Sequence, residues 1–286
     1  MTNVSLDLSN KLPTGQINII RRVVRTATKL GLTRLFIVGA QARDLILQYA
    51  YDLPVRRATN DIDFGIVVET WDEFAKLLDA LITSEGFQPH PHQQQRLLHE
   101  EGAIIDLVPF GNLEHVSGLI VWPPDFAIEM STVGFREAYA NSIVIRLAED
   151  LVVKVASLAG LALLKIVAWS DRHFERDAQD LGLIMKNYLD AGNQERVYSN
   201  GGDCSDLLNK DFDYDKANAR VLGRDIGRLL TDESCRAIER VLVEETAEAS
   251  SSALVMAMVR NNANYHGDFD VALGMLSILR EGVLEG

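Results

Sequence analysis

The strongest constraint on the fold is the segment Asp61–Val68, which places two carboxylates in an otherwise apolar run. Its first residues alternate between polar and apolar, as they do in a β-strand with one buried face. Asp61 and Asp63 are two residues apart, so on a strand both side chains point the same way, roughly 6–7 Å from one another. The sequence therefore predicts a strand that presents a pair of carboxylates on one face of a sheet.

A third carboxylate, Asp106, lies in the predicted strand 103–109, where its immediate neighbours are apolar. A lone buried charge is costly unless it is paired or bound to a metal. Mg²⁺ binds a few carboxylates together with phosphate oxygens, and two such ions can hold both oxygens of a phosphoryl transfer. Aspartate is also common in turns, so Asp61 and Asp63 alone would be weak evidence. With Asp106, they are predicted to bind Mg²⁺ or Mn²⁺. We expect Pro109 to end its strand, because it cannot donate to a ladder.

Two further elements surround this predicted strand. A β-rich run at 34–38 precedes Gly39-Ala40 and a predicted helix at 41–50. A turn of small residues before a helix lets a triphosphate approach backbone N–H groups, although a turn that simply needs positive φ is at least as good an explanation of the turn alone. Downstream, Thr70 and Glu73 have the capping-box spacing, which predicts a helix that extends to about residue 82.

The pattern changes near residue 151, where strand-like segments give way to helical periodicity. A polar, turn-rich stretch at 191–216 is predicted to be a loop. A chain of 286 residues favours two domains. We predict an α+β domain with a mixed sheet over residues 1–150 and a helical domain over 151–286. The predicted helices of the second domain are 153–170, 174–189, 216–230, 232–249, 252–263 and 269–282.

Charge and composition limit the partners. The formal net charge of −13 repels nucleic acid, so an RNA partner would need a local basic patch. The best candidate lies on the predicted helix 15–31, although a solvated helix face is the favoured interpretation. Only two cysteines occur, too few for a disulfide framework. No secretory signal is visible and the longest apolar stretch is too short to span a membrane, so we expect a soluble, cytoplasmic protein without a membrane partner. The candidate patch comprises Arg21, Arg22, Arg25, Lys29, Arg34, Arg56 and Arg57.

The order of these motifs resembles the DNA polymerase beta-like nucleotidyltransferase superfamily, in which a small-residue turn, an Asp-x-Asp strand and a later Asp follow one another. Within it, the chain is similar to the AbiEii/AbiGii type of toxin nucleotidyltransferase, which adds a lysine on a helix and a later Arg- and Asp-containing run. Lys165, Arg172 and the run 175–180 match those later motifs, so the resemblance spans about residues 35 to 185. Two positions depart from the pattern: Ala40 replaces Ser or Gly, and Arg176 is followed directly by Asp177 without an intervening lysine.

The resemblance implies a polymerase-beta-like fold and Mg²⁺-dependent transfer of a nucleoside monophosphate from an NTP to a hydroxyl, with the tRNA 3′ end the leading acceptor and a protein second. It also implies a toxin with an antitoxin partner. Asp61 and Asp63 would bind the metal, and Asp106 would be a third ligand or the base. Lys165 would contact a phosphate or the leaving pyrophosphate, because a lysine on an apolar helix face needs an anion. The implied nucleotide-binding residues are Gly39, Ala40, Arg43, Asp44, Lys165, Arg172, Asp177 and Asp180.

Several alternatives remain open at this stage. The Lys165 stem could lie along the core with its ammonium group in water. Arg172, Arg176 and Asp180 could form a salt-bridge ladder on one helical face. Asp177 and Asp180 could orient Lys165 rather than touch a nucleotide. The rival to an enzyme is a degenerate member that binds nucleotide or a partner protein without chemistry, and Ala40, which lacks a hydroxyl, is the residue that favours it.

Overall fold

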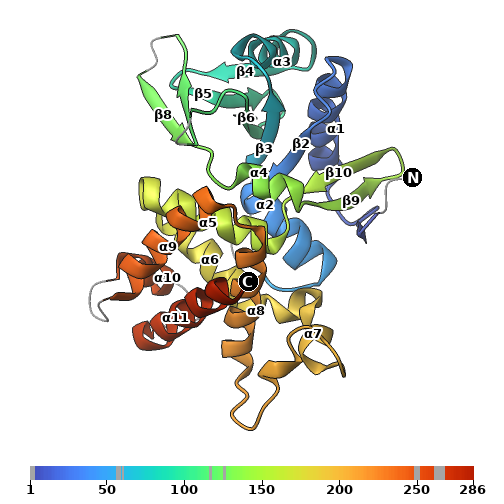
Figure 1. The fold of residues 1–286 in the computed structure, drawn as a ribbon. Coiled ribbons are helices and arrows are strands. Elements are labelled where there is room, and N and C mark those ends of the chain that lie inside the picture. The colour runs from blue at the N-terminus through green and yellow to red at the C-terminus, as the bar shows by residue number, and fades with distance from the viewer. Residues whose placement is uncertain are drawn as a thin grey trace. The chain divides into compact units, whose positions relative to one another are not determined.

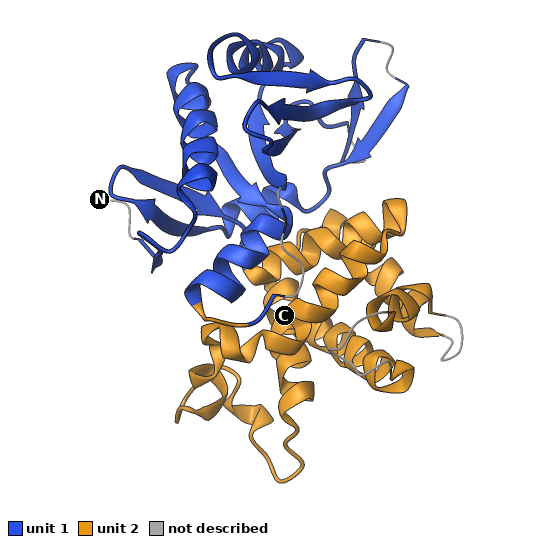
Figure 2. Ribbon diagram, turned by 180° about the vertical axis from the view of Figure 1, so that it is seen from behind, with its two compact units in different colours: residues 1–50, 54–157 blue, residues 51–53, 158–286 orange. Residues whose placement is uncertain are grey.

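The computed structural model describes residues 4–55, 59, 61–115, 118–124, 127–247, 252–260 and 268–286. The chain divides into two compact units (Figure 1, Figure 2). Unit 1 comprises residues 1–50 and 54–157, and unit 2 comprises residues 51–53 and 158–286. Among the described residues every strand belongs to unit 1, and unit 2 is built from helices. The predicted α+β organisation is confirmed.

Unit 1 is organised around a mixed sheet in the order β1-β9-β10-β2-β3-β6-β5-β4. A separate hairpin is formed by β7 (Leu119–Trp122) and β8 (Ile128–Ser131). The strands of the large sheet are β1 (Leu6–Asp7), β2 (Leu35–Val38), β3 (Asp61–Val68), β4 (Phe87–His90), β5 (Gln93–His99), β6 (Ile104–Gly111), β9 (Ile143–Ala148) and β10 (Leu151–Val155).

The helices of unit 1 bury apolar faces at helical spacing. In the first, Ile20, Val23 and Ala27 are fully buried, as the predicted amphipathic pattern requires. Thr70 caps α3 by accepting a hydrogen bond from the Glu73 N–H at 3.3 Å. The helices are α1 (Thr14–Lys29), α2 (Gly39–Asp44), which continues into the π-helix η1 (Leu45–Ala50), α3 (Trp71–Ser84) and α4 (Phe135–Ala140).

Three central strands position the predicted carboxylates. β2 runs antiparallel to β3, and β3 runs parallel to β6. All four residues of β2 are buried, and most of β3 and β6 is buried as well. Val38, at the end of β2, is the register partner of Asp63, whose partner on the other side is Asp106. The end of β2 and two of the three carboxylates therefore meet at one level of the sheet.

The prediction of a helix over residues 153–170 is wrong at its start. Leu151–Val155 forms β10, which pairs antiparallel with β9 and parallel with β2, and helix α5 begins only at Leu158. The five residues alternate between buried and more exposed positions, and valine fits a pleated, half-buried surface. The sheet consequently continues past residue 150, and the two units divide at residue 157.

Prolines lie inside two strands of the large sheet. Pro109 does not end β6, which continues to Gly111 in register with β3. The pairing of β5 with β6 reaches only Asp106, so at Pro109 there is no second strand to receive a bond from an N–H. Pro89 lies in β4, the outermost strand, where proline is tolerated.

Unit 2 consists of helices whose bounds agree with most of the predicted runs. The predicted loop 191–216 is not wholly irregular, because it contains three short helical turns. The ends of the helices predicted to reach residues 249 and 263 lie outside the described residues. No helix within the described ranges combines the length and apolar character needed to cross a membrane. The elements are α5 (Leu158–Arg172), α6 (Glu175–Asn187), η2 (Leu189–Asn193), α7 (Glu195–Tyr198), η3 (Ser205–Leu207), α8 (Tyr214–Leu229), α9 (Asp232–Ala247), α10 (Ala253–Val259) and α11 (Phe269–Glu285).

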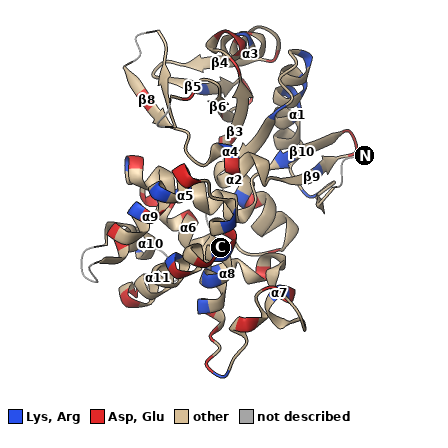
Figure 3. Cartoon of the chain, in the orientation of Figure 1, with Lys and Arg blue, Asp and Glu red and all other residues tan. Residues whose placement is uncertain are grey.

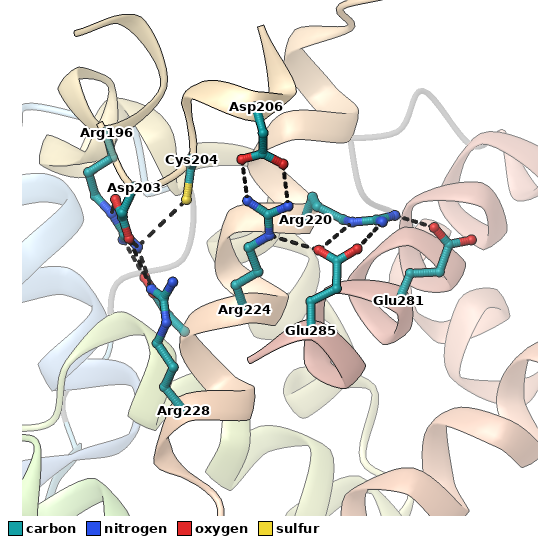
Figure 4. Close-up of polar contacts among 10 residues, drawn as sticks. Arg196, Asp203, Cys204, Asp206, Arg220, Arg224, Arg228, Glu281 and Glu285 are labelled. Atoms are coloured by element: carbon teal, nitrogen blue, oxygen red, sulfur yellow. Dashed lines mark hydrogen bonds and ion pairs between the residues drawn. The ribbon is translucent and has the colours of Figure 1, made fainter. Parts of the chain in front are cut away.

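Helices α8 and α11 pack with their backbones in close approach. A Cβ atom on Gly223 of α8 would lie 2.3 Å from the backbone oxygen of Leu279 on α11, so only glycine fits there. Ion pairs flank this contact, as Figure 4 shows. Arg224 on α8 donates to Glu285 of α11 at 2.7 Å and to Asp206 of η3 at 2.6 and 2.7 Å. These bonds tie the last helix to the body of unit 2.

Candidate active site

The two aspartates of β3 lie on the opposite face of the strand from its buried apolar residues. Ile62 and Phe64 are buried, whereas Asp61 and Asp63 are half-buried. The alternation follows from the period-2 geometry of a strand, which places both carboxylates on one side. Unit 1 therefore presents the predicted pair on a rigid, central strand of its sheet.

Asp106 lies directly beside this pair. It is the register partner of Asp63 in the parallel ladder between β3 and β6. Its neighbours Ile105 and Leu107 are fully buried, and Asp106 itself is 9% exposed. Neighbouring strands lie about 4.8 Å apart, so the backbones that carry Asp63 and Asp106 are in direct contact. The sheet brings together the three carboxylates that the sequence singled out.

The partner of Asp106 is Arg96 of β5, which sequence analysis missed. Its guanidinium group donates hydrogen bonds to both carboxylate oxygens of Asp106, from Nε to Oδ1 at 2.8 Å and from Nη2 to Oδ2 at 2.6 Å. The same Nη2 lies 3.5 Å from Oδ2 of Asp61. The hydrogen bond to Asp106 and the surrounding carboxylates raise the pKa of Arg96 despite partial burial, so its charge is permanent. Only the antiparallel register of β5 on β6, in which Arg96 faces Asp106, could have revealed it.

Gly39 lies directly against Asp63. It follows β2, begins α2, and has φ +66°, a conformation that favours glycine. A Cβ atom there would lie 1.9 Å from Oδ2 of Asp63, so the carboxylate rests against the bare Cα of the turn. Two independent constraints, backbone conformation and the Asp63 side chain, require glycine at this position. The next residue, Ala40, is buried and offers no hydroxyl group.

Arg43 and Asp44, one turn further along α2, are buried and bonded to one another. Nε of Arg43 donates to Oδ1 of Asp44 at 2.7 Å, and the two side chains are 3% and 7% exposed. Such a pair is costly to break because either charge alone would be uncompensated in the interior. This contact gives both residues a structural role; their predicted contact with a nucleotide stays a prediction.

The donor chemistry of the cluster suits a divalent cation. Carboxylate oxygens are the ligands that Mg²⁺ and Mn²⁺ prefer, and the Arg96 guanidinium shows that Asp61 and Asp106 converge on one positive group. Within the described residues, however, no three carboxylate, histidine or cysteine side chains surround a common point as a finished metal site would. Mg²⁺ is usually held by one or two carboxylates with phosphate oxygens and water, so an incomplete protein cage is compatible with it.

Unit 2 holds a second charged cluster, around Lys165 of α5. Its ammonium group lies 2.9 Å from Oδ1 of Asp177 and 2.7 Å from Oδ2 of Asp180, both on α6 and both buried. Burial alone lowers the pKa of Lys165, but the charges of Asp180 and Asp177 outweigh it and the net pKa is raised. Burial has the opposite effect on the carboxyl group of Asp177 and raises its pKa. The charges of Lys165 and Arg172 outweigh that effect, so the net pKa of Asp177 is lowered. Lys165 is therefore an ammonium held by two carboxylates, rather than one that merely reaches water.

The alternative of a salt-bridge ladder formed by Arg172, Arg176 and Asp180 on one helical face is wrong. The chain leaves the helical conformation between α5 and α6, where His173 has φ +51°, so Arg172 and Arg176 lie on different helices. Arg172 instead donates to both oxygens of Asp177, at 2.7 and 3.0 Å. The guanidinium groups of Arg172 and Arg176 also lie over the ring of Phe174, at 5.2 and 6.0 Å from its centroid.

The candidate RNA patch on α1 is largely compensated by acidic partners. Basic positions of α1 are visible in Figure 3. Arg21 pairs with Asp150, and Arg22 and Arg25 both pair with the buried Glu85. These contacts favour the interpretation of α1 as an ordinary charged helix face. Arg34 is likewise paired, with Glu69, and Arg56 and Arg57 lie outside the described residues.

Comparison with known proteins decides the family. Residues 45–259 match the model of the family described as nucleotidyl transferase AbiEii toxin, type IV toxin–antitoxin system, which is more than half of the chain. The chain belongs to this family. It is therefore a nucleotidyltransferase, and the family predicted from the order of the motifs is confirmed.

More distant comparisons add little. No curated protein sequence matches the chain. Among solved structures, the antibiotic-resistance factor ANT(2'')-Ia is 17% identical, with 56% of this chain and 75% of that one covered and a TM-score of 0.34. JHP933 from Helicobacter pylori is 12% identical, with 95% and 93% covered and a TM-score of 0.38. The cyclic dinucleotide synthase CdnE of Elizabethkingia meningoseptica is 12% identical, with 92% and 89% covered and a TM-score of 0.27. The family match, and not these similarities, establishes what the chain is.

Proposed function

We propose that this nucleotidyltransferase transfers a nucleoside monophosphate from an NTP to a hydroxyl group in a reaction that requires Mg²⁺ or Mn²⁺. The observation that carries the proposal is the arrangement of Asp61, Asp63 and Asp106 on the adjacent strands β3 and β6. In the reaction, the acceptor oxygen bonds to the α-phosphorus and the bond from that phosphorus to pyrophosphate breaks. The hydroxyl proton passes to a base.

We expect the three carboxylates to have different roles. Asp61 and Asp63, on the same face of β3, would hold the ion, and Asp106 would serve as a third ligand or as the base for the acceptor hydroxyl. A bound ion supplies positive charge where negative charge collects on the phosphate oxygens. Placement on a central strand favours this role, because rigid elements hold charged groups at fixed spacing.

The turn after β2 would receive the triphosphate. Gly39 and Ala40 offer backbone N–H groups at the start of α2, and Gly39 brings no side chain between the turn and Asp63. Because Ala40 lacks a hydroxyl, only backbone donors are available at that position. Arg43 and Asp44 would support the turn through their buried ion pair.

The cluster in unit 2 would supply positive charge for a phosphate. Lys165 is the candidate, oriented by Asp177 and Asp180, with Arg172 as a second cation bound to Asp177. Its two carboxylate partners keep Lys165 charged and fix its position. A lysine that is fixed in advance loses less conformational entropy when it meets a phosphate.

The acceptor and the partner are inferred from the family. The 3′ end of tRNA is the first candidate acceptor and a protein side chain the second. A toxin of a type IV toxin–antitoxin system implies an antitoxin encoded nearby, which would be recognised as a small helix-turn-helix protein. Expression of both genes together and measurement of growth and of co-purification would test that partnership.

Labelled nucleotides test the activity. The full chain is incubated with each α-labelled NTP, Mg²⁺ or Mn²⁺, and a tRNA pool or total protein. Asp61→Ala and Asp63→Ala should lower label transfer by at least about 100-fold, which corresponds to ~2.7 kcal/mol of transition-state stabilisation. Asp7→Ala is the matched control, because Asp7 is an exposed carboxylate on the edge strand β1 and should leave transfer unchanged. No transfer by the unaltered protein to RNA or to protein would refute the proposal.

The absence of a hydroxyl at Ala40 favours a second candidate, a degenerate member that binds nucleotide without turnover. Titration calorimetry with a non-hydrolysable NTP separates the two. Binding that requires Mg²⁺ and Asp61, together with no label transfer to any acceptor, would favour the degenerate protein. Binding with transfer would exclude it.

A further inference from the structure

Arg96 is a basic residue whose side chain contacts two of the proposed metal ligands, Asp61 and Asp106. It lies on β5, opposite Asp106 in the antiparallel ladder, and its side chain is 24% exposed. Its guanidinium takes both oxygens of Asp106 at 2.6 and 2.8 Å and approaches Asp61 at 3.5 Å. One cation therefore already bridges two of the carboxylates that the proposed function assigns to a divalent ion.

A guanidinium and a divalent ion compete for these oxygens. Each carboxylate oxygen has more than one lone pair, yet two cations on the same carboxylate repel one another strongly in a half-buried site. Asp106 can bind a metal ion fully only if Arg96 moves away or shares it at a cost. A simple structural ion pair would explain the Asp106 contact, but not the reach of the same nitrogen to Asp61.

We propose that Arg96 is a resident counter-cation that suppresses metal binding in the nucleotide-free protein and couples metal binding to triphosphate binding. The inference rests on the proposed function. A guanidinium fork matches phosphate as well as carboxylate, and the partly exposed Arg96 has solvent beside it into which it can turn. An arriving triphosphate offers Arg96 a new anionic partner, which releases Asp106 to the metal ion. Metal and nucleotide then bind together more tightly than either does alone.

Calorimetric titration with MnCl₂ tests this on the full chain, without and with a saturating non-hydrolysable NTP. In the unaltered protein, the nucleotide should strengthen Mn²⁺ binding at least about tenfold, a coupling of ~1.4 kcal/mol. Arg96→Gln should bind Mn²⁺ alone at least tenfold more tightly than the unaltered protein, and most of the coupling should vanish. Arg96→Lys keeps the positive charge but loses the bidentate guanidinium group, so its Mn²⁺ affinity should lie between those of the unaltered protein and Arg96→Gln. If Arg96→Gln does not fold, Arg96→Lys provides the test.

Two variants make the result specific. Arg34→Gln is the control. Arg34 is exposed, pairs with Glu69, and precedes β2, whereas Gly39 follows the other end of that strand. The substitution changes the net charge by the same amount as Arg96→Gln and should leave Mn²⁺ binding unchanged. Asp63→Ala should abolish Mn²⁺ binding in the Arg96→Gln background. Equal or weaker Mn²⁺ binding by Arg96→Gln and Arg96→Lys, with binding by the unaltered protein that Asp63→Ala removes, would overturn the role of Arg96 alone. No Mn²⁺ binding by any variant, with or without nucleotide, would overturn the metal site and with it the role of Arg96.

Discussion

Replacement of Gly39 by alanine tests the link between the turn and the carboxylate cluster. Alanine at φ +66° costs roughly 1–2 kcal/mol relative to glycine, because its Cβ meets the backbone. The new Cβ would also lie 1.9 Å from Oδ2 and 2.8 Å from Cγ of Asp63, which forces the carboxylate out of place. Overpacking of this kind adds roughly 1–3 kcal/mol. We expect Gly39→Ala to lower the free energy of unfolding by about 2–5 kcal/mol and to weaken Mn²⁺ binding.

Urea unfolding of the full chain, followed by circular dichroism, measures the first effect, and titration with MnCl₂ measures the second. Gly31→Ala is the control, since Gly31 has φ +79° with nothing within 4 Å of a built Cβ, so it reports backbone strain alone. In the double variant with Asp63→Ala, the two contacts under 3.0 Å disappear and the nearest atom is the Cβ of residue 63 at 3.1 Å, so most of the excess cost should disappear. A Gly39→Ala protein that is no less stable than Gly31→Ala and binds Mn²⁺ normally would refute the reasoning.

Three further predictions concern unit 2. Lys165→Met should cost about 3–5 kcal/mol in urea unfolding, because it leaves buried carboxylates short of a counter-charge, and a cost below ~1 kcal/mol would contradict that. The hydrogen bond from Arg196 lowers the pKa of Asp203 to about 2 in the folded state, against an ordinary value of 3.8, so its stabilisation is present above that value and is lost as the pH falls. Asp203→Asn should therefore flatten the acid side of the melting-temperature profile. Gly223→Ala should lower the free energy of unfolding by at least about 1–3 kcal/mol, because its Cβ would lie 2.3 Å from a backbone oxygen. Gly274→Ala, on α11 with open space around it, should instead raise the free energy of unfolding by ~0.5–1 kcal/mol. Urea unfolding measures both effects.

Locally determined features could be predicted from the sequence. The cap of α3 depends on Thr70 and Glu73, three residues apart, and the expected bond from the Glu73 N–H to Thr70 forms. The return bond differs in detail, since the Glu73 carboxylate accepts from the N–H of Glu69 rather than from that of Thr70. The pair Asp61 and Asp63 was predictable for the same reason, because the period of a strand alone puts both on one side.

Features that depend on distant partners could not be predicted. The run Leu151–Val155 is apolar enough for a helix or a strand, and it becomes β10 because β9 and β2 offer it two neighbours. Pro109 is tolerated in β6 because the pairing of β5 with β6 ends at Asp106, which no property of residues 103–109 indicates. In both cases the deciding fact is the length or order of other strands. The break at His173, by contrast, falls between the predicted helices 153–170 and 174–189, and it is the ladder alternative that disagreed with it by placing Arg172 and Arg176 on one helical face.

The case of Asp106 shows how a correct physical premise led to an incomplete conclusion. A buried carboxylate needs a compensating cation, and from the sequence alone a metal ion was the evident candidate. The sheet supplies Arg96 instead, from β5, which follows β4 in the chain and brings Arg96 to Asp106 only through its register on β6. Three neighbouring carboxylates on two adjacent strands would repel one another in the absence of metal, so an internal cation stabilises the free protein. That same cation must weaken the hold of the cluster on a divalent ion. Stability of the empty site and affinity for metal are therefore opposed at Arg96, and an anionic substrate that draws the guanidinium away is the simplest way to reconcile them.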